Sequence, residues 1–454
     1  MVNPKIFKAY DIRGIYPSEI DEEAVEKIGQ AFINFLVEKQ EIVKKIVIGR
    51  DMRLSSSTLF KALVSGISAF DIEIIDIDVC STPMFYFAIQ QLGASGGMMI
   101  TASHNPASYN GLKLCRENAI SISGESGIYE IRDQINSIVS VTSNTNFKAS
   151  LIKVNILDKY IDFILSKTQL NEIKPLKIVV DCGNGMVGPE IIKIAKKLSC
   201  QIIPLFCEPD GSFPNHEANP LKEENLTALK QKVLEEEADL GIAFDGDGDR
   251  VAFLDERGEV TRGDFITALL AKELLLEKPG QKILYEIRSS WIVREEIQKS
   301  GGIPVLSRAG HAPIKDKMRS ENILFGGEFS GHYFFKDLGF VDNALMAMLK
   351  ILEIISKENK SFSATLAPLN KYYASGEINF EIRDKDAKIN ELEKTYKNRA
   401  KNIMHLDGLT MEFDDWWFNL RPSNTEPVLR LNLEAKNLDS LKEKKEWLVN
   451  FLRS

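Results

Sequence analysis

The chain has 454 residues, which exceeds the size of one hydrophobic core and predicts three or four domains. A hydrophobic fraction of 44% is typical of a globular protein, and a net charge of −8 excludes a broadly basic surface for nucleic acid or an acidic membrane. Five cysteines without a Cys-x-x-Cys pair argue against a disulfide framework or a structural zinc site and favour the cytoplasm. The longest apolar stretch, 265–276, is interrupted by Lys272 and Glu273, so we expect no membrane span.

Strands and helices are predicted to alternate between residues 44 and 100. A buried strand at 44–51 is followed by a helix at 55–70 with a serine-rich start. A strand at 72–79, a helix at 82–92 and a strand at 96–100 follow. This alternation predicts an α/β domain with a mostly parallel sheet.

The same pattern begins again near residue 176 and near residue 265. The second block has predicted strands at 176–181, 201–206 and 238–244 and helices at 189–198 and 226–237. The third block has predicted helices at 265–276, 291–299, 314–319 and 343–356 and strands at 282–287 and 303–307. The tail differs, with strands at 376–382, around 416–417 and at 428–433 and helices at 388–396 and 438–452, which predicts a small α+β domain. We therefore expect domains at 1–152, 153–254, 255–367 and 368–454.

Three carboxylates alternate with two glycines in the run DGDGDR at 245–250. Apolar runs on both sides, 238–244 and 251–254, are predicted strands, so the acids lie on a tight loop. A hard divalent cation would relieve their mutual repulsion, whereas the plainer interpretation is a solvated acidic turn. An EF-hand is excluded because Arg250 stands where its sharp turn needs glycine and because its flanks would be helices.

Ser103 follows the predicted strand at 96–100, within the run TASHNP at 101–106. In open α/β sheets, the loops beyond the carboxyl ends of strands form the binding crevice. A serine there, among hydrogen-bonding neighbours, is a candidate nucleophile or phosphoryl carrier, although a helix N-cap is the alternative. A serine hydrolase is disfavoured because the chain has no Gly-x-Ser-x-Gly elbow.

Gly183, Gly185 and Gly188 form a Gly-x-Gly-x-x-Gly run between a predicted strand and a predicted helix. This run is the best case for a dinucleotide site, with Glu208 near a strand end as the acid for the ribose. The same glycines would serve a tight turn that binds nothing.

Two further loops carry groups suited to a sugar phosphate. The run GEFSGH at 327–332 offers an acid, a hydroxyl and an imidazole, which suit sugar hydroxyls and the transfer of one proton. The run RPSNTEP at 421–427 offers an arginine fork and several small donors for phosphate, although the chain has no P-loop. Each run is also compatible with an ordinary surface turn.

With all four runs together, the chain resembles the α-D-phosphohexomutases, most closely the phosphomannomutase/phosphoglucomutase group. The matching runs follow the family's order: AYDIRG at 9–14, GRDMRLSS at 49–56, TASHNP, NGLK at 110–113, DGDGDR, AGH at 309–311, GEFSGH and RPSNTEP. They cover essentially the whole chain. The glycine run at 183–188 resembles the opening of the family's second domain, which argues against a dinucleotide.

The resemblance implies three similar mixed-sheet α/β domains and a smaller C-terminal α+β domain around a central cleft. It implies a phosphoserine at Ser103 and Mg²⁺ held by Asp245, Asp247, Asp249 and one seryl-phosphate oxygen. The phosphoryl group would pass between Ser103 and a hexose 1-phosphate or 6-phosphate, through a hexose 1,6-bisphosphate that turns over in the cleft. The enzyme would be a cytoplasmic monomer or weak dimer that acts on small sugar phosphates.

The resemblance also assigns the remaining roles. Arg13, Lys113 and His332 would lie at the reacting centre, with His104 beside Ser103. A buried lysine near other cations can have its pKa lowered enough to act as a base. The expected substrate contacts are Tyr10, Arg250, Arg288, His311, Glu328, Ser330, Arg421, Ser423, Asn424 and Thr425. Glu328 and Ser330 would hold sugar hydroxyls, and the last four would hold the phosphate that does not react.

Two departures leave the preferred sugar open: Arg288, where a lysine is expected in bacterial relatives, and Phe329, where methionine is common. The nearest alternative is a phosphoglucosamine mutase, disfavoured because that subgroup tends to open with FGTDGxRG and to carry GEQSGH. An NAD-dependent oxidoreductase would need the 183–188 glycines to bind the cofactor. A non-catalytic sugar-phosphate binding protein would not need Ser103 and all three aspartates.

Overall fold

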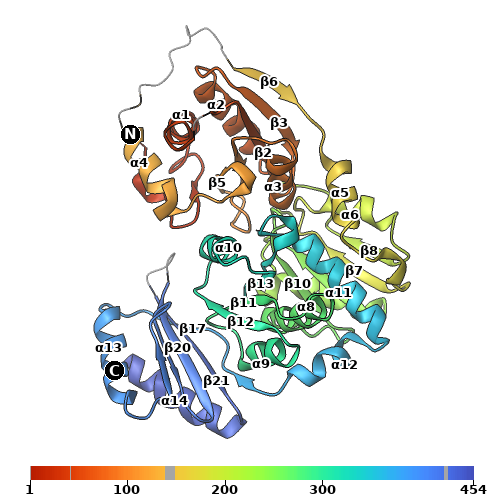
Figure 1. The fold of residues 1–454 in the computed structure, drawn as a ribbon, viewed down its shortest axis with the longest axis vertical. Coiled ribbons are helices and arrows are strands. Elements are labelled where there is room, and N and C mark those ends of the chain that lie inside the picture. Colours follow the sequence, from red (N-terminus) through yellow and green to blue (C-terminus); the bar gives the residue numbers. More distant parts are fainter. Residues whose placement is uncertain (1, 41, 137, 139–148, 424–427) are drawn as a thin grey trace. The chain divides into compact units, whose positions relative to one another are not determined.

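The computed structural model describes residues 2–40, 42–136, 138, 149–423 and 428–454, which form two compact units (Figure 1). The first unit comprises Met1–Thr261 and Ser330–Ser363, and the second comprises Arg262–Phe329 and Ala364–Ser454. The chain therefore leaves the first unit after residue 261 and returns to it at Ser330. Among the described residues, no helix combines the length and the apolar character that a membrane crossing requires.

A mixed sheet of order β1-β5-β4-β2-β3-β6 opens the first unit. Figure 1 labels four of its strands, β2, β3, β5 and β6. Its strands are β1 (Ile12–Ile15), β2 (Lys45–Arg50), β3 (Glu73–Val79), β4 (Gly96–Ile100), β5 (Tyr109–Arg116) and β6 (Ser150–Lys153). The pairs β4–β2 and β2–β3 are parallel, as the sequence predicts. The pair β3–β6 is parallel as well, although the sequence analysis placed no strand at 150–153. In contrast, β5 runs antiparallel to both β4 and β1, because the chain turns back directly after the loop that carries Ser103.

Helices cover both faces of this sheet. Gly96 approaches Phe32 and Leu36 of α1 (Glu22–Lys39), whereas its neighbour Gly97 approaches Phe85 of α3 (Thr82–Gln91). Because successive strand residues point to opposite faces, α1 and α3 lie on opposite sides. The helices α2 (Ser56–Ile67) and α4 (Tyr129–Ile135) share a buried apolar cluster with α1.

A smaller mixed sheet of order β10-β9-β7-β8 follows. It contains β7 (Lys177–Asp181), β8 (Gln201–Leu205), β9 (Leu240–Phe244) and β10 (Val251–Leu254), with helices α5 (Leu157–Leu165), α6 (Gly188–Ala195) and α7 (Thr227–Glu235). β9 and β10 are antiparallel, and Phe244 lies opposite Val251, so residues 245–250 form a hairpin loop. The first unit also contains β14 (Tyr333–Phe335), β15 (Val341–Asp342) and α11 (Ala344–Glu358).

Cys182 and Cys207 form a disulfide just beyond β7 and β8, with their Cα atoms 4.8 Å apart. The odd cysteine count argued against a disulfide framework, and this single pair departs from that expectation. The reason is topological: β7 and β8 are parallel neighbours, so residues that follow them meet at one edge of the sheet. The other cysteines, Cys80, Cys115 and Cys200, are buried and are not part of this disulfide.

The second unit contains a parallel group of strands and an antiparallel sheet. The parallel group is β12 (Ile303–Ser307), β11 (Lys282–Glu286) and β13 (Phe325–Gly327), with helices α8 (Gly263–Glu277), α9 (Trp291–Lys299) and α10 (His311–Ser320). The antiparallel sheet has the order β16-β21-β20-β19-β18, and β17 also pairs with β21. Its strands are β16 (Tyr373–Ala374), β17 (Ile378–Phe380), β18 (Asn402–Met404), β19 (Leu409–Glu412), β20 (Trp416–Pro422) and β21 (Leu429–Ala435).

Helices α13 (Lys385–Tyr396) and α14 (Leu438–Arg453) share an apolar core with this antiparallel sheet, and α12 (Phe362–Leu366) leads into it. Along the sequence, the structure thus has three α/β segments with parallel and antiparallel strand pairs and a final α+β segment. This order confirms the predicted fold class.

Candidate active site

Ser103 lies in the serine loop, residues 101–106, between β4 and β5. Its φ of 50° lies in the left-handed region, which is energetically unfavourable for any residue other than glycine. Such strained backbone angles are typical of functional positions. The Ser103 hydroxyl donates a hydrogen bond to Oδ2 of Asp245 over 2.8 Å and lies 3.1 Å from Nδ1 of His104. The structure therefore brings the predicted serine directly against the acidic loop, residues 245–250.

Glycine at position 246 makes this approach possible. A Cβ atom on Gly246 would lie 2.6 Å from the carbonyl oxygen of Ser103, too close for any side chain. The same loop accepts two backbone hydrogen bonds, from Met186 to the Gly246 carbonyl over 2.9 Å and from Thr82 to the Asp247 carbonyl over 2.8 Å. The acidic loop is thus held by three segments that are distant in sequence.

The three aspartates form a compact cluster of oxygen donors. One ligand oxygen from each of Asp245, Asp247 and Asp249 lies within 4.8 Å of the others, and all three residues are buried. Oδ1 of Asp245 accepts the backbone N–H groups of residues 248, 249 and 250, each over 3.1 Å. Burial, with repulsion from Asp249 and Asp247, raises the pKa of Asp245 well above its ordinary value. A cation beside these oxygens would remove that repulsion.

Lys113, on β5, reaches the same cluster. Its Nζ lies 2.6 Å from Oδ2 of Asp247 and 2.5 Å from Oδ2 of Asp249. Burial lowers the pKa of the ammonium, but the two carboxylates outweigh burial and raise it above its ordinary value. This is opposite to the lowered pKa considered from the sequence, because the nearest charges are anions and not cations. In this arrangement the Lys113 ammonium is positively charged and donates hydrogen bonds to both carboxylates.

His332 and Arg250 complete this part of the site. Nε2 of His332 lies 3.3 Å from Oδ1 of Asp249 and 3.3 Å from Nε of Arg250, and its Nδ1 lies 3.1 Å from the Ser330 hydroxyl. Gly331, with a φ of 87°, lets the backbone approach β10, where the Val251 N–H donates to the Gly331 carbonyl over 3.1 Å. That bond fixes His332 beside the acidic loop.

His104 and Arg13 border the serine. Burial, with Arg250 and Arg13 nearby, lowers the pKa of His104 well below its ordinary value, so its imidazole is neutral near pH 7. Arg13, on β1, donates hydrogen bonds to Asn105 of the serine loop and to Asp11. Tyr10 is half-buried in the bend before β1.

Arg53 contacts the main chain of the serine loop, which the sequence alone does not reveal. Its side chain is fully buried and donates to the main-chain carbonyls of Ser103 (2.8 Å), Asn105 (2.6 Å), Pro106 (2.7 Å) and Tyr109 (3.0 Å). It also donates to Oδ2 of Asp51 over 3.1 Å. The run GRDMRLSS contains this arginine, but a short run does not show where its side chain points.

Thr82 was also missed. Its hydroxyl donates a 2.6 Å hydrogen bond to Oδ2 of Asp247, across 165 residues of sequence. Thr82 is the first residue of α3, and the sequence identifies it only as the start of a predicted helix.

The glycines of the run at 183–188 lie in close contact with other parts of the chain. A Cβ on Gly185 would lie 2.8 Å from the Gly246 carbonyl, and one on Gly188 would lie 1.9 Å from the Cys207 carbonyl. Gly183 has a φ of 55° and lies against Ala218. These contacts explain all three glycines without a dinucleotide.

The second unit holds the other group of predicted residues. Arg288, in the turn after β11, donates to both oxygens of Glu286 over 2.8 and 2.9 Å and lies 3.6 Å from Glu328. The Glu328 carboxylate also accepts the Gly310 N–H over 3.2 Å, next to His311, the first residue of α10.

Arg421 is buried at the end of β20 and donates to Glu377 over 3.3 Å. Ser423 is half-buried and follows that strand, whereas the predicted Asn424 and Thr425 lie outside the described residues.

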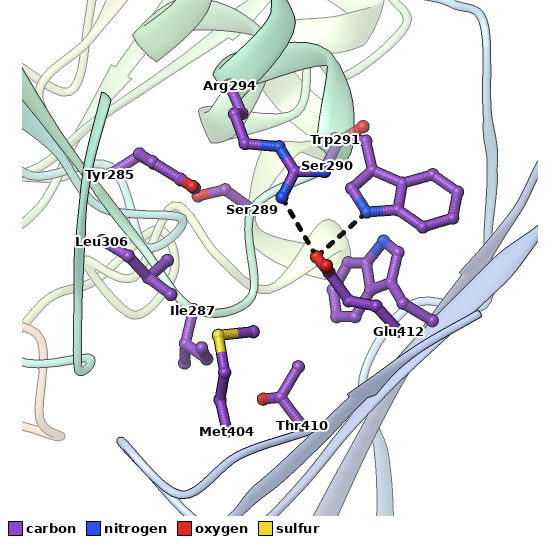
Figure 2. A pocket seen from close by; sticks show the side chains of 11 residues that line it. Tyr285, Ile287, Ser289, Ser290, Trp291, Arg294, Leu306, Met404, Thr410 and Glu412 are labelled. Carbon is purple, nitrogen blue, oxygen red and sulfur yellow. Dashed lines mark hydrogen bonds and ion pairs between the residues drawn. The ribbon is translucent and has the colours of Figure 1, made fainter. Parts of the chain in front are cut away.

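Cavities lie among the described residues of the second unit. Arg288 and Phe329 line one of about 370 Å³, together with Arg262, Tyr372 and other residues. Another, of about 100 Å³, is shown in Figure 2. There Glu412 accepts hydrogen bonds from Nε1 of Trp291 over 3.2 Å and from Arg294 over 3.3 Å, and no predicted site residue lines the cavity.

Known families match nearly the whole chain. Models of phosphoglucomutase/phosphomannomutase alpha/beta/alpha domains I, II and III match residues 4–141, 158–258 and 262–372, and the C-terminal domain model matches 377–450. The chain belongs to the phosphoglucomutase/phosphomannomutase family. As a member of this family, it is an enzyme and an isomerase of carbohydrate metabolism.

Individual relatives agree with the family assignment. A protein named phosphohexose mutases from Xanthomonas campestris is 40% identical over 451 residues, covering 98% of this chain and 99% of its own. A phosphomannomutase from Vibrio cholerae is 40% identical over 460 residues, covering 98% of each chain. The crystal structure of a phosphoglucomutase/phosphomannomutase family protein from Burkholderia thailandensis superposes with a TM-score of 0.90 at 31% identity, covering 100% of this chain and 98% of that one.

Proposed function

We propose that this family member interconverts hexose 1-phosphates and hexose 6-phosphates of mannose, glucose or both, through a phosphoserine at Ser103. The observation that carries this proposal is the 2.8 Å contact between the Ser103 hydroxyl and Asp245, inside a buried cluster of three carboxylates. A hydroxyl held against a cation site is suited to carry a phosphoryl group, because phosphoryl transfer depends mainly on positioning and charge stabilisation.

The residues around Ser103 fit a transfer in both directions. The bond between phosphorus and the serine oxygen would break as phosphorus bonds to a sugar hydroxyl, which gives up a proton while Ser103 regains one. The Nδ1 atom of neutral His104 lies 3.1 Å from the serine oxygen, so His104 would accept or donate the proton of the Ser103 hydroxyl. Lys113, Arg13 and Arg250 would face the charge on the phosphoryl oxygens, and His332 would act on the sugar side.

The donor set fits Mg²⁺. Within the described residues, Oδ1 of Asp247 is buried and accepts no hydrogen bond, so the cluster has a carboxylate oxygen to spare. We propose that Asp245, Asp247 and Asp249 hold Mg²⁺ with one oxygen of phosphorylated Ser103. The bound cation would supply positive charge to the phosphoryl group. A hexose 1,6-bisphosphate would serve as intermediate and activator.

The remaining assignments are parts of the same proposal. Glu328 and Ser330 would hold sugar hydroxyls, and Tyr10, Arg288 and His311 would be further substrate contacts. Arg421 and Ser423, with Asn424 and Thr425, would hold the phosphate that does not react. We also propose that the enzyme acts in the cytoplasm as a monomer or weak dimer, with no nucleic acid or membrane partner, and that its domains span 1–152, 153–254, 255–367 and 368–454.

A coupled assay tests the function. Mannose, glucose and glucosamine phosphates are compared with and without the matching hexose 1,6-bisphosphate, which also separates the phosphoglucosamine alternative. Ser103→Ala should lose at least about 10³-fold in kcat while binding of sugar phosphate survives. A chelator should abolish turnover, and Mg²⁺ should restore it. Unchanged turnover of the alanine variant would refute the phosphoserine, and turnover that resists chelation would refute the metal.

A further inference from the structure

The Cys182–Cys207 disulfide lies one short turn away from the acidic loop. Cys182 and Cys207 lie just beyond β7 and β8, two neighbouring parallel strands that are both labelled in Figure 1. Cys182 begins the glycine turn, which we define as residues 182–188. In this turn the N–H of Met186 donates to the carbonyl of Gly246 over 2.9 Å. The disulfide therefore adjoins a segment that directly contacts the acidic loop.

Close backbone packing couples the glycine turn to both of its neighbours. A Cβ atom on Gly185 would lie 2.8 Å from the Gly246 carbonyl oxygen, and one on Gly188 would lie 1.9 Å from the Cys207 carbonyl oxygen. In a protein interior packed this densely, one segment does not shift without moving the next. Gly246 stands between two of the three aspartates, so a displaced turn would move the carboxylate cluster.

The glycine turn is also held by hydrogen bonds that do not involve the sulfur atoms. Asn184 donates with its main-chain N–H to the Phe206 carbonyl over 2.7 Å and with its side chain to the Glu208 carbonyl over 2.9 Å. The N–H of Cys182 donates to the Leu205 carbonyl over 3.0 Å. These bonds remain when the disulfide is reduced, so reduction should loosen the turn without unfolding it.

The location of the pair favours a reversible disulfide. In the cytoplasm, the compartment proposed above, disulfides are rare, and those that form are usually transient and either catalytic or redox-sensing. Cys207 is 8% exposed, whereas Cys182 is fully buried. Because thiol–disulfide exchange needs access to a sulfur atom, a small thiol or disulfide would reach the pair through Cys207.

We propose that Cys182 and Cys207 form a redox modification site that controls how firmly the acidic loop is held and, with it, the affinity for Mg²⁺. The oxidised pair fixes the glycine turn against Gly246. In the reduced protein the turn loosens, and Mg²⁺ binds less tightly. The co-reactant is a low-molecular-weight disulfide such as glutathione disulfide. This inference rests on the proposed function, because it takes the three aspartates to hold Mg²⁺.

Oxidation of the pair proceeds in two exchange steps. The Cys207 thiol loses its proton, and the thiolate attacks one sulfur of glutathione disulfide, which forms a mixed disulfide and releases one glutathione that takes up the proton. The Cys182 thiol then loses its proton and attacks the Cys207 sulfur, which releases the second glutathione as a thiol. The two cysteines together lose two electrons, and glutathione disulfide gains two. A dithiol reductant reverses both steps.

The test compares wild-type protein treated with glutathione disulfide and with dithiothreitol, both without denaturant. Alkylation and mass spectrometry should find the pair joined in the first sample and reduced in the second. In the reduced sample, hydrogen exchange of residues 245–250 should be about tenfold faster, and the calorimetric Kd for Mg²⁺ should be about tenfold higher. Exchange at residues 409–420, in the second unit, is the internal control and should be the same in both samples.

Three outcomes would overturn the proposal. The pair could stay reduced in glutathione disulfide, it could resist dithiothreitol in the folded protein, or the exchange of residues 245–250 could be the same in both samples. Hydrogen exchange needs neither substrate nor Mg²⁺. An enzyme that converts no hexose phosphate would therefore refute the proposed function, while the exchange measurement would still decide the role of the disulfide.

Two variants locate the effect. Cys207→Ser cannot form the disulfide, so in both samples it should show the exchange and the Mg²⁺ affinity of the reduced wild type. Cys200→Ser is the matched control, because Cys200 directly precedes β8, is 9% exposed and lies outside the pair, and it should respond as the wild type does. A redox response that persists in Cys207→Ser would contradict the assignment. If Cys207→Ser does not fold, the comparison of oxidised and reduced wild type decides.

Discussion

Arg53 is expected to hold the serine loop in place, and Arg53→Met tests this role. The arginine donates four hydrogen bonds to main-chain carbonyls of residues 103–109 and one to Asp51, and its side chain is fully buried. Methionine keeps the length of the side chain and removes every donor. The carbonyls and the buried carboxylate of Asp51 would then be left without their cation.

The size of the effect follows from these contacts. Hydrogen bonds to a charged group contribute about 1.5–3 kcal/mol each, but the loop can relax and admit water, so the sum overstates the loss. Removing one partner of a buried ion pair costs about 3–5 kcal/mol, which we take as the expected fall in the free energy of unfolding of the first unit. With a urea m-value of about 2–3 kcal/mol/M, the midpoint would fall by about 1–2.5 M.

The assay can separate the two units. All 4 tryptophans lie in the second unit, at positions 291, 416, 417 and 447, so their fluorescence does not report on the first. Circular dichroism and hydrogen exchange of residues 101–116 should show the early transition, while the tryptophan transition stays in place. Turnover should fall as well, because Ser103 would no longer be held against Asp245.

Arg132→Met is the matched control. This arginine is 36% exposed, and its ion-pair partner Asp133 is exposed as well, so its loss should leave the urea midpoint unchanged. If the Arg53→Met protein unfolds at the wild-type urea concentration and hydrogen exchange at residues 101–116 is unchanged, Arg53 does not hold the serine loop in place.

Two further predictions follow from the same unit. Thr82→Val removes the 2.6 Å hydrogen bond to Asp247 and should raise the Mg²⁺ concentration for half-maximal activity about 10- to 100-fold. Thr82→Ser keeps the hydroxyl and should need the same Mg²⁺ concentration as the wild type. An unchanged Mg²⁺ requirement in the valine variant would show that Thr82 does not orient Asp247 for the metal. Burial raises the pKa of Glu190, on α6, to about 8, despite a hydrogen bond from Ser81. Between pH 5 and 8 the folded chain therefore keeps a proton that the unfolded chain has lost, so the stability from this group is present at low pH and is lost as pH rises through 8. In the wild type, the unfolding free energy measured in urea should fall by up to about 1.4 kcal/mol per pH unit from pH 5 to 8, and Glu190→Gln should remove this slope. If the pH profiles of the wild type and the variant are parallel, the pKa of Glu190 is not raised.

Much of the secondary structure could be predicted because its causes are local. The strand at 96–100 and the helix at 291–299 were placed at their observed bounds, since apolar runs and turn residues sit within each segment. The direction of β5 against β4 was not predicted, because strand direction depends on which neighbour the chain pairs with. The Cys182–Cys207 pair has the same cause, since counting cysteines says nothing about which strand ends meet.

The candidate site divides in the same way. Ser103 and the aspartates 245, 247 and 249 could be named from the sequence because each loop carries its reactive groups in one short run. Arg53 and Thr82 could not, because their partners Ser103 and Asp247 lie 50 and 165 residues away in the sequence, and only folding determines those contacts. The direction of the pKa shift of Lys113 could not be predicted either, since it depends on whether cations or anions are nearest to the ammonium.

By itself, the sequence determined the family, the order of α/β and α+β segments, and the residue types that could hold a cation and a phosphate, because these follow from short runs and their order. The tertiary structure alone decided that the Ser103 hydroxyl meets Asp245 of the acidic loop and that Gly246, which has no side chain, leaves room for the main-chain carbonyl of Ser103. It also decided which buried charges face each other, and with that the direction of every pKa shift in the site. Distances between residues far apart in the chain determine electrostatic energies, and a linear sequence does not contain them.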